Sequence, residues 1–441
     1  MKIVKFGGSS LADATCFQKV KNIIESDPSR KIVVVSAIGK RKKDDNKITD
    51  LLYLCHAHLQ YGVSTENILS MIEERYRCIK DDLHLSIDLH HEFEIIRQNM
   101  MKENIDYLVS RGEYLCAKMM SEYLGYQFID AKDVILFDYN GKINIEKTKE
   151  AFHKFMPLHT GIVVPGFYGS INHQRIKIMA RGGSDITGSI LADLFDATVY
   201  ENWSDVSGIL AADPKIVHEP KRIESITYNE LRELSYMGAN VLHDEAVFPV
   251  REKNIPINIR NTFEPDNPGT MILNDCSELD KKHPPHTITG IAGKKDFTSI
   301  TIYKKGISNE SGIALKAFQI LEKYKISIEN MPCGIDSFSL IVSSSKIADC
   351  LYEMLSDIKE ILQPDSIRIS DSLSLIAVVG RGMVKNTGIS GKIFGELGAH
   401  QINIQTISQG ADELNIIVGV HNDDFEKTIQ VIYEKFIRRI S

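Results

Sequence analysis

The first 40 residues alternate between short apolar runs and one amphipathic helical pattern. Ile3, Val4 and Phe6 form the first run, residues 17–24 repeat apolar side chains at helical spacing, and Lys31 to Ala37 (KIVVVSA) is a second, largely apolar run. Apolar runs of this kind are typical of strands buried on both faces of a parallel sheet. The pattern therefore predicts a β-α-β unit at the start of the chain.

The same alternation continues to about residue 285. Ile48 to about Met120 carries helical patterns with few glycines, and a further helix is expected near residue 184, with Ser184 or Asp185 as its N-cap. Short runs that predict strands lie at 128–130, 134–137, 161–166, 176–180 and 197–200. Residues 1–285 are therefore expected to form one α/β domain with a largely parallel sheet.

The C-terminal third contains an internal repeat, which follows a linker predicted at His283 to His286. Residues 311–342 align without gaps on residues 387–418, so that Gly312 matches Gly388 at a constant offset of 76 residues. Each copy predicts a strand, a glycine turn, an amphipathic helix, a strand, a hairpin and a strand. Two related α+β modules fit a paired ligand-binding or dimerising unit better than a solenoid.

Composition restricts the class of protein. The chain has 441 residues, of which 43% are hydrophobic and 25% charged, as in an ordinary globular protein of two to four domains. A net charge of -7 provides no basic field for nucleic acid. Seven scattered cysteines, the lack of a leader-like N-terminus and the lack of a long apolar stretch predict a cytoplasmic protein with free thiols.

Two glycine turns are the strongest candidates for chemistry. Lys5-Phe6-Gly7-Gly8-Ser9 ends the first predicted strand, and Arg181-Gly182-Gly183-Ser184-Asp185 opens a predicted helix. Ligands bind at the carboxyl ends of strands in open α/β sheets, where backbone N–H groups and a helix N-terminus meet phosphate oxygens. Either turn alone is equally consistent with a purely structural role, but together they favour a triphosphate site. Lys5 would neutralise the transferring phosphoryl group, and Asp185 would fix Lys5 by an ion pair or hold substrate-borne Mg²⁺.

Three weaker candidates accompany these turns. Arg111-Gly112-Glu113 suits an amino acid, with an arginine for its carboxylate and a glutamate for its ammonium group, although such a pair is more often a helix-surface ion pair. Residues 203–215 form a turn-rich segment that could contact a nucleotide. The charged loop at 39–47 (GKRKKDDNK) could be mobile and near the substrate, although its run of charges alone favours a merely solvated loop. His90-His91 is interpreted as helix surface.

These motifs, in this order, resemble those of the aspartokinases in the amino-acid kinase superfamily. The matching stretches are KFGGSS at 5–10, RGE at 111–113, GFYG at 166–169, RGGSD at 181–185, WSDVSG at 203–208 with Asp213-Pro214, and GANVLH at 238–243. The duplicated module is similar to the paired ACT domains of that family. The resemblance implies a three-layer amino-acid kinase fold with a central, mostly parallel sheet at 1–285, followed by two α+β ACT-type (ferredoxin-like) modules at 294–368 and 372–441.

The resemblance also implies an activity and a set of site residues. The activity is MgATP-dependent phosphorylation of the side-chain carboxylate of L-aspartate to 4-phospho-L-aspartate, the entry step to lysine, threonine and methionine. Mg²⁺ would arrive with ATP, without a separate metal site on the protein. By motif match, Lys5 and Asp185 would be the catalytic pair; Lys5, Gly7, Gly8, Ser9, Ser36, Ser204, Asp205 and Lys215 would bind ATP; and Thr49, Glu113, Phe167, Arg181 and Ser184 would hold aspartate.

Departures from the family pattern leave alternatives open. Asn240 stands where the family often has a lysine that reaches the ATP phosphates, with Lys177 as a candidate replacement, and Glu329 stands where an aspartate often helps to bind an effector amine. The chain could instead phosphorylate another acidic amino acid, or be a catalytically weak sensor that binds an amino acid at its ACT-like pair. A homodimer or higher homo-oligomer is expected through these modules, with an amino-acid effector as a further partner.

Overall fold

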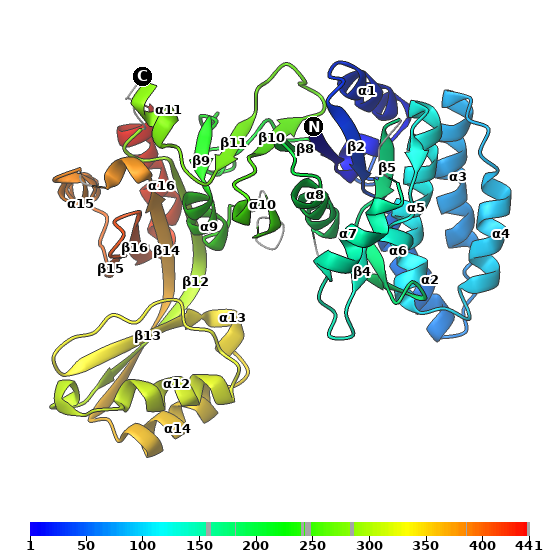
Figure 1. The fold of residues 1–441 in the computed structure, drawn as a ribbon. Coiled ribbons are helices and arrows are strands. Elements are labelled where there is room, and N and C mark those ends of the chain that lie inside the picture. The colour runs from blue at the N-terminus through cyan, green and yellow to red at the C-terminus, as the bar shows by residue number, and fades with distance from the viewer. Residues whose placement is uncertain are drawn as a thin grey trace. The chain divides into compact units, whose positions relative to one another are not determined.

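The computed structural model describes residues 1–155, 160–180, 182–239, 242, 248–282, 286–384 and 386–438 (Figure 1). The chain divides into two compact units. The first comprises Met1–Ile209, Glu224–Tyr228 and Val241–Cys276, and the second comprises Leu210–Ile223, Asn229–Asn240 and Ser277–Ser441. The boundaries at 1–285, 294–368 and 372–441 remain a prediction, but residues 210–223, 229–240 and those from 277 onward group with the C-terminal unit.

An eight-stranded sheet organises the first unit. Its strand order is β3-β5-β2-β1-β8-β10-β11-β9, and every neighbouring pair is parallel except β10 with β11. The predicted α/β class with a largely parallel sheet is therefore confirmed. The strands are β1 (Lys2–Phe6), β2 (Arg30–Val35), β3 (Gln127–Phe128), β5 (Ile162–Pro165), β8 (Val199–Ser204), β9 (Ser225–Thr227), β10 (Ile257–Asn261) and β11 (Thr270–Leu273).

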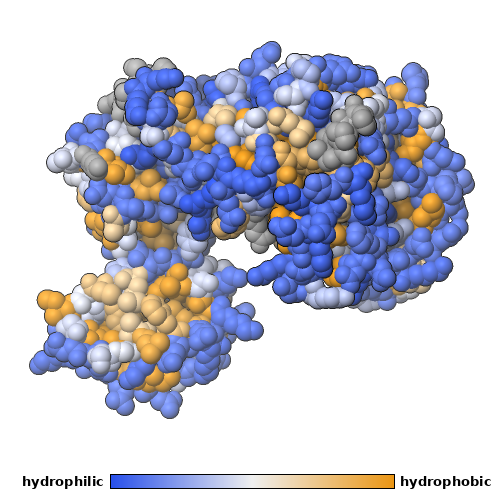
Figure 2. All heavy atoms as spheres, viewed as in Figure 1, coloured by the Kyte–Doolittle hydropathy of each residue, from blue (hydrophilic) through white to orange (hydrophobic). Residues whose placement is uncertain are grey.

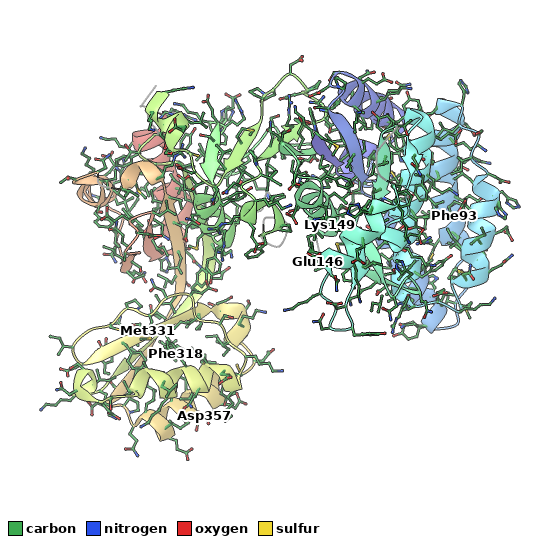
Figure 3. All side chains as sticks on the ribbon, viewed as in Figure 1. Phe93, Glu146, Lys149, Phe318, Met331 and Asp357 are labelled. Carbon is green, nitrogen blue, oxygen red and sulfur yellow. The ribbon has the colours of Figure 1, made fainter. Side chains whose placement is uncertain are left out.

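Helices cover both faces of this sheet. Val4 and Phe6 of β1 belong to a continuous apolar core with the helices of one layer, and within that layer Phe93 packs against Tyr76 (Figure 3). On the other face, Gly188 of α8 lies against the Tyr200 ring. The helices of this unit are α1 (Ala14–Glu25), α2 (Ile48–Gln60), α3 (Glu66–Leu83), α4 (Leu89–Asn99), α5 (Ile105–Leu124), α6 (Ala131–Val134), α7 (Ile145–His153), α8 (Gly183–Leu194) and α10 (Phe248–Glu252).

Two local predictions need correction. Neither Ser184 nor Asp185 is the N-cap of α8, because Gly182 adopts a left-handed conformation (φ 79°) and the helix begins at Gly183. The stretch 134–137 is only partly a strand, since the helical turn α6 includes Val134 and β4 covers Leu136–Phe137. Strand β4 joins β6 (Tyr168–Ile171) and β7 (Arg175–Ile178) in a separate three-stranded sheet.

The second unit is built on one five-stranded sheet of order β13-β12-β14-β16-β15. Strands β12 and β14 are each 14 residues long and pair antiparallel along nearly their whole length. Residues 290–294 of β12 pair with 375–379 of β14, and 297–303 pair with 366–373. The elements are β12 (Gly290–Tyr303), β13 (Ser337–Ser343), β14 (Ser366–Val379), β15 (Thr406–Gln409), β16 (Asn415–His421), α9 (Tyr228–Tyr236, all but its first residue), α11 (Ser277–Lys282), α12 (Ile313–Lys323), α13 (Ser344–Ile347), α14 (Leu351–Leu362), α15 (Ile389–Ala399) and α16 (Phe425–Tyr433).

The internal repeat is visible in the helices of this unit. Helices α12 and α15 each begin directly after a glycine with positive φ, Gly312 at 83° and Gly388 at 85°. The strand predicted after the helix forms in the second copy as β15, whereas the first copy has only isolated bridges at Asn330 and Cys333. Pro332 lies between those bridges and cannot donate a ladder hydrogen bond. No helix among the described residues is long and apolar enough to cross a membrane.

Candidate active site

A cavity of about 1060 Å³ lies in the first unit, where β1 and β2 end and α8 begins. Most of the predicted site residues contribute to its wall, although they come from distant parts of the sequence. These residues are Lys5, Gly8, Ser9, Ser36, Thr49, Glu113, Phe167, Ser184, Asp185 and Asp205.

The glycine turn after β1 packs backbone against backbone. Gly39 donates its N–H to the Gly8 carbonyl at 2.9 Å, and a Cβ on Gly8 would lie 2.9 Å from the Ala37 carbonyl oxygen. A Cβ on Gly39 would overlap the Gly8 backbone. Gly7 donates to the Trp203 carbonyl at 2.9 Å. Close approach therefore requires glycine at positions 8 and 39, where a side chain would collide with the facing backbone.

Lys5 and Asp185 form an ion pair at the base of the cavity. The distance from Lys5 Nζ to Asp185 Oδ1 is 2.5 Å, and both side chains are largely buried. Asn202 Nδ2 donates to the same carboxylate oxygen at 2.8 Å, and the Tyr200 hydroxyl donates to the Asp185 carbonyl at 3.1 Å. Asp185 lies in the first turn of α8. The lysine is thus held in one position, with its charge beside the helix N-terminus.

Glu113 of α5 reaches the cavity from the helical layer. Its side chain is buried, and its carboxyl group is hydrogen-bonded to the backbone at Ala37. Its Oε2 atom has no hydrogen-bond partner among the described residues. Burial raises the pKa of Glu113 to about 8. A buried acceptor without a partner, on the wall of a polar cavity, is suited to a cationic group of a ligand.

Arg111 does not join Glu113 in the cavity. Its guanidinium lies among the rings of Tyr107, Tyr114 and Tyr168, with 4.4 Å to the Tyr114 centroid, and donates to Ser110 Oγ at 2.9 Å. The expected pairing of an arginine and a glutamate around one amino acid is therefore wrong for Arg111. Its role here is to anchor α5 by stacking.

Phe167 is held in an unusual backbone conformation at the cavity wall. Its φ is 77°, which is costly for a bulky residue. The Phe167 N–H donates to Thr187 Oγ1 at 3.2 Å, and its carbonyl accepts from Met179 at 2.7 Å. A Cβ on Gly183 would lie 2.8 Å from the Phe167 ring. The start of α8 and the 166–169 turn therefore fix each other.

Some predicted residues lie elsewhere. Gly7 and Ser204 do not line the cavity, although a Cβ on Gly7 would lie 3.8 Å from Lys5 Nζ and 4.0 Å from Ser204 Cβ. Lys215 belongs to the second unit. Arg181 and Asn240 lie outside the described residues. Lys177, the suggested replacement cation, is not on the wall but beside the turn at Gly141.

Sequence reasoning missed several residues of the wall. Lys40 and Lys47, from the loop interpreted as merely solvated, both line the cavity, as do Asp50 and Tyr53 of the adjoining helix. The position of this loop could have indicated its place in the site, because it directly follows a buried strand of a parallel sheet, and ligands bind at that end of the strands. His90 and His91 are exposed as predicted.

Comparison with known proteins identifies two kinds of domain. The model of the amino acid kinase family matches residues 1–261, and the model of an ACT domain matches residues 376–436. The chain is 35% identical to aspartokinase 3 of Bacillus subtilis (strain 168), over 99% of this chain and 98% of that protein.

Solved structures give the same result. The crystal structure of Clostridium acetobutylicum aspartate kinase is 46% identical with a TM-score of 0.92, over 99% of this chain and 100% of the other. E. coli aspartokinase III in complex with aspartate and ADP is 25% identical with a TM-score of 0.75, over 98% of this chain and 99% of the other. The same E. coli protein in complex with lysine and aspartate has a TM-score of 0.76 at 25% identity, over 99% of each chain.

Proposed function

The chain belongs to the aspartokinases of the amino acid kinase family, and from this membership we propose that its cavity transfers the terminal phosphoryl group of ATP to the side-chain carboxylate of L-aspartate. The product is 4-phospho-L-aspartate, the first intermediate towards lysine, threonine and methionine. One observation carries the assignment of the site. The Lys5–Asp185 pair lines the same cavity as the Glu113 oxygen that has no partner among the described residues, so that a phosphoryl group and an amino acid can be bound together.

The reaction needs positioning and charge stabilisation rather than a general base. A side-chain carboxylate with an ordinary pKa near 3.9 is already ionised at neutral pH, so no proton has to be removed from the nucleophile. Lys5 would stabilise charge on the transferring phosphoryl group, and Asp185 would hold that lysine in place. The turn containing Gly7, Gly8 and Ser9 would bind phosphate oxygens.

The remaining assignments rest on the family resemblance together with positions in the cavity. Glu113 would receive the α-ammonium group of aspartate, with Thr49, Phe167 and Ser184 around the rest of the molecule. Ser36 and Asp205 would lie along the nucleotide, as would Ser204. Arg181 as the carboxylate partner and Lys215 as a nucleotide contact rest on motif match alone. Mg²⁺ would come with ATP, and the carboxylates of Asp185 and Asp205 suit its preference for oxygen.

The second unit would regulate the enzyme in the cytoplasm as part of a homodimer or larger homo-oligomer. Its first module exposes apolar side chains, among them Leu315 at 61% and Phe318 at 42%. Hydrophobic residues are visible on the surface in Figure 2, and Figure 3 labels Phe318. A patch of this kind fits association with a second copy. Lysine is bound in one E. coli relative, and an amino-acid effector is proposed here at the paired modules. Glu329, the residue expected near its amine, accepts a hydrogen bond from the Tyr236 hydroxyl at 2.8 Å.

The function is tested by ADP release with MgATP and L-aspartate, for the wild type beside Lys5→Ala. Loss of Lys5 is expected to lower kcat by roughly 10²–10³-fold, the usual cost of removing one preorganised transition-state contact. Lys31→Ala, at an exposed position on β2, is the matched control and should retain full activity. Equal or better turnover of L-glutamate would overturn the choice of aspartate. Amino-acid binding at the modules with negligible turnover in folded wild type would favour the sensor alternative.

A further inference from the structure

The loop at residues 39–47 brings two uncommitted positive charges to the cavity. Lys40 and Lys47 both line its wall, and neither forms an ion pair with any residue that the structure describes. Lys5, the third lysine on the wall, is already paired with Asp185. Four carboxyl groups also line the cavity, from Asp50, Glu113, Asp185 and Asp205. Two anionic substrates would therefore enter a cavity in which, among the described residues, Lys40 and Lys47 are the lysines without an ion pair.

A buried arginine anchors this loop. Arg75 of α3 is 6% exposed, and its Nη1 donates to the Asn46 carbonyl at 2.6 Å while Nη2 donates to the Gly39 carbonyl. Both ends of the loop are thus held by one guanidinium. Arg41 Nε pairs with Asp45 at 2.9 Å within the loop, and Arg75 lies 3.6 Å from the same carboxylate.

The neck of the loop is tied to the glycine turn of β1. Ile48 donates its N–H to the Ile38 carbonyl at 3.4 Å, which closes the loop, and Gly39 donates to Gly8 at 2.9 Å. Lys40 follows Gly39 directly, so its backbone lies beside the Gly8–Ser9 turn. Lys47 lies two residues before Thr49, on the opposite arm of the loop. Lys40 thus lies next to the turn proposed for the phosphates, and Lys47 lies near Thr49, which is proposed to contact aspartate.

We propose that Lys40 and Lys47 are substrate-binding residues of the phosphoryl transfer, Lys40 for the ATP phosphates and Lys47 for the aspartate carboxylates, and that Arg75 positions the loop that carries them. The inference rests on the proposed function. Its physical basis is that a flexible lysine is effective only when its backbone is preorganised, because otherwise the entropy of fixing the side chain cancels much of the charge interaction. The contacts of Arg75 supply that preorganisation.

The loop provides its own control. Lys42 and Lys43 are exposed lysines in the same loop, but neither lines the cavity. Replacement of Lys42 by alanine changes the net charge of the loop by the same amount as replacement of Lys40. A general effect of loop charge would therefore change the nucleotide affinity of both variants equally, whereas direct binding by Lys40 would change that of Lys40→Ala alone.

The experiment measures KM for ATP and for L-aspartate in Lys40→Ala, Lys47→Ala and Lys42→Ala, and titrates ADP into each protein by calorimetry. Lys40→Ala is expected to raise KM for ATP and Kd for ADP about tenfold, and Lys47→Ala to raise KM for aspartate about tenfold, as for loss of one charge-assisted contact. Lys42→Ala should remain within about twofold of wild type, and Lys40→Arg should restore most of the nucleotide affinity because it retains the charge.

Arg75 is tested through the loop itself. Arg75→Lys should raise the rate of tryptic cleavage at residues 40–43 while the circular dichroism spectrum stays unchanged, and should raise both KM values together. The inference is overturned if Lys40→Ala and Lys47→Ala behave like Lys42→Ala, or if Lys40→Ala affects aspartate alone. Absence of turnover in the wild type would instead refute the proposed function, and the ADP titrations would still test Lys40.

Discussion

Binding of aspartate is expected to release a proton from Glu113. The side chain is 4% exposed, and its Oε2 has no hydrogen-bond partner among the residues that the structure describes, so the free carboxyl group is poorly solvated. Burial raises its pKa to about 8. The α-ammonium group of aspartate would favour the ionised form, so a carboxyl group that is mostly protonated before binding has to lose its proton on binding.

The magnitude follows from that pKa. At pH 7 about one Glu113 side chain in eleven is ionised, so binding of aspartate should release about 0.9 protons. The affinity should be about tenfold weaker, or about 1.4 kcal/mol, than for the fully ionised form. Affinity should improve about tenfold from pH 6 to pH 7, and then level off above pH 8. The sign is fixed because protonation competes with the ligand, so acid weakens binding.

Calorimetry of L-aspartate binding, with ADP present, gives the proton count when it is repeated in phosphate and in Tris, two buffers of different ionisation enthalpy. Glu113→Gln keeps the size of the side chain but cannot titrate, and should bind aspartate more weakly at pH 8 with no proton release. The reasoning is refuted if the wild type releases fewer than about 0.2 protons at pH 7 and its affinity is flat from pH 6 to 8.

Three further predictions concern packing and stability. Gly39→Ala should lower activity more than about tenfold in kinetic assays, because its Cβ would overlap the Gly8 backbone. Gly391→Ala, in a helix with open space around it, should be neutral or stabilising by about 0.5–1 kcal/mol in thermal melts. Glu201→Gln should lower the unfolding free energy by about 3–5 kcal/mol in urea melts, since it leaves the buried Arg30 guanidinium without the anionic charge that lies 2.8 Å from its Nε. Glu113→Gln should raise the melting temperature relative to wild type at pH 8 but not at pH 4.5, because the raised pKa makes the wild-type fold lose stability as pH rises between those values.

Much of the catalytic unit was predictable because its signals are local. The apolar runs of β1 and β2 and the glycines after them are encoded within a few residues, and they fix a cavity at the carboxyl ends of the strands. The expected ion pair of Lys5 and Asp185 is also present. Such features depend on strand periodicity and turn chemistry, which act over short distances along the chain.

The features that were missed depend on distant residues. The loop at 39–47 has the composition of a solvated segment, but Arg75, far along the chain, binds the carbonyls at both of its ends, and Gly39 is bonded to Gly8. Arg111 and Glu113 are close in sequence but point to different surroundings, because successive residues on a helix face different directions. The grouping of 210–223 with the C-terminal unit arises from bonds such as that from the Lys221 N–H to the Tyr433 hydroxyl at 2.7 Å.

The long strand β12 also constrains the order in which the regulatory unit folds during synthesis. Its first half, residues 290–294, pairs with residues 375–379 of β14. These partner residues leave the ribosome only after the whole first module has been made. The first module has all its strands once residues 366–373 have emerged, so it can close while the earlier half of β12 still has a bare edge. A nascent chain that stalls at this point would present that edge as a template for chaperones or for neighbouring chains.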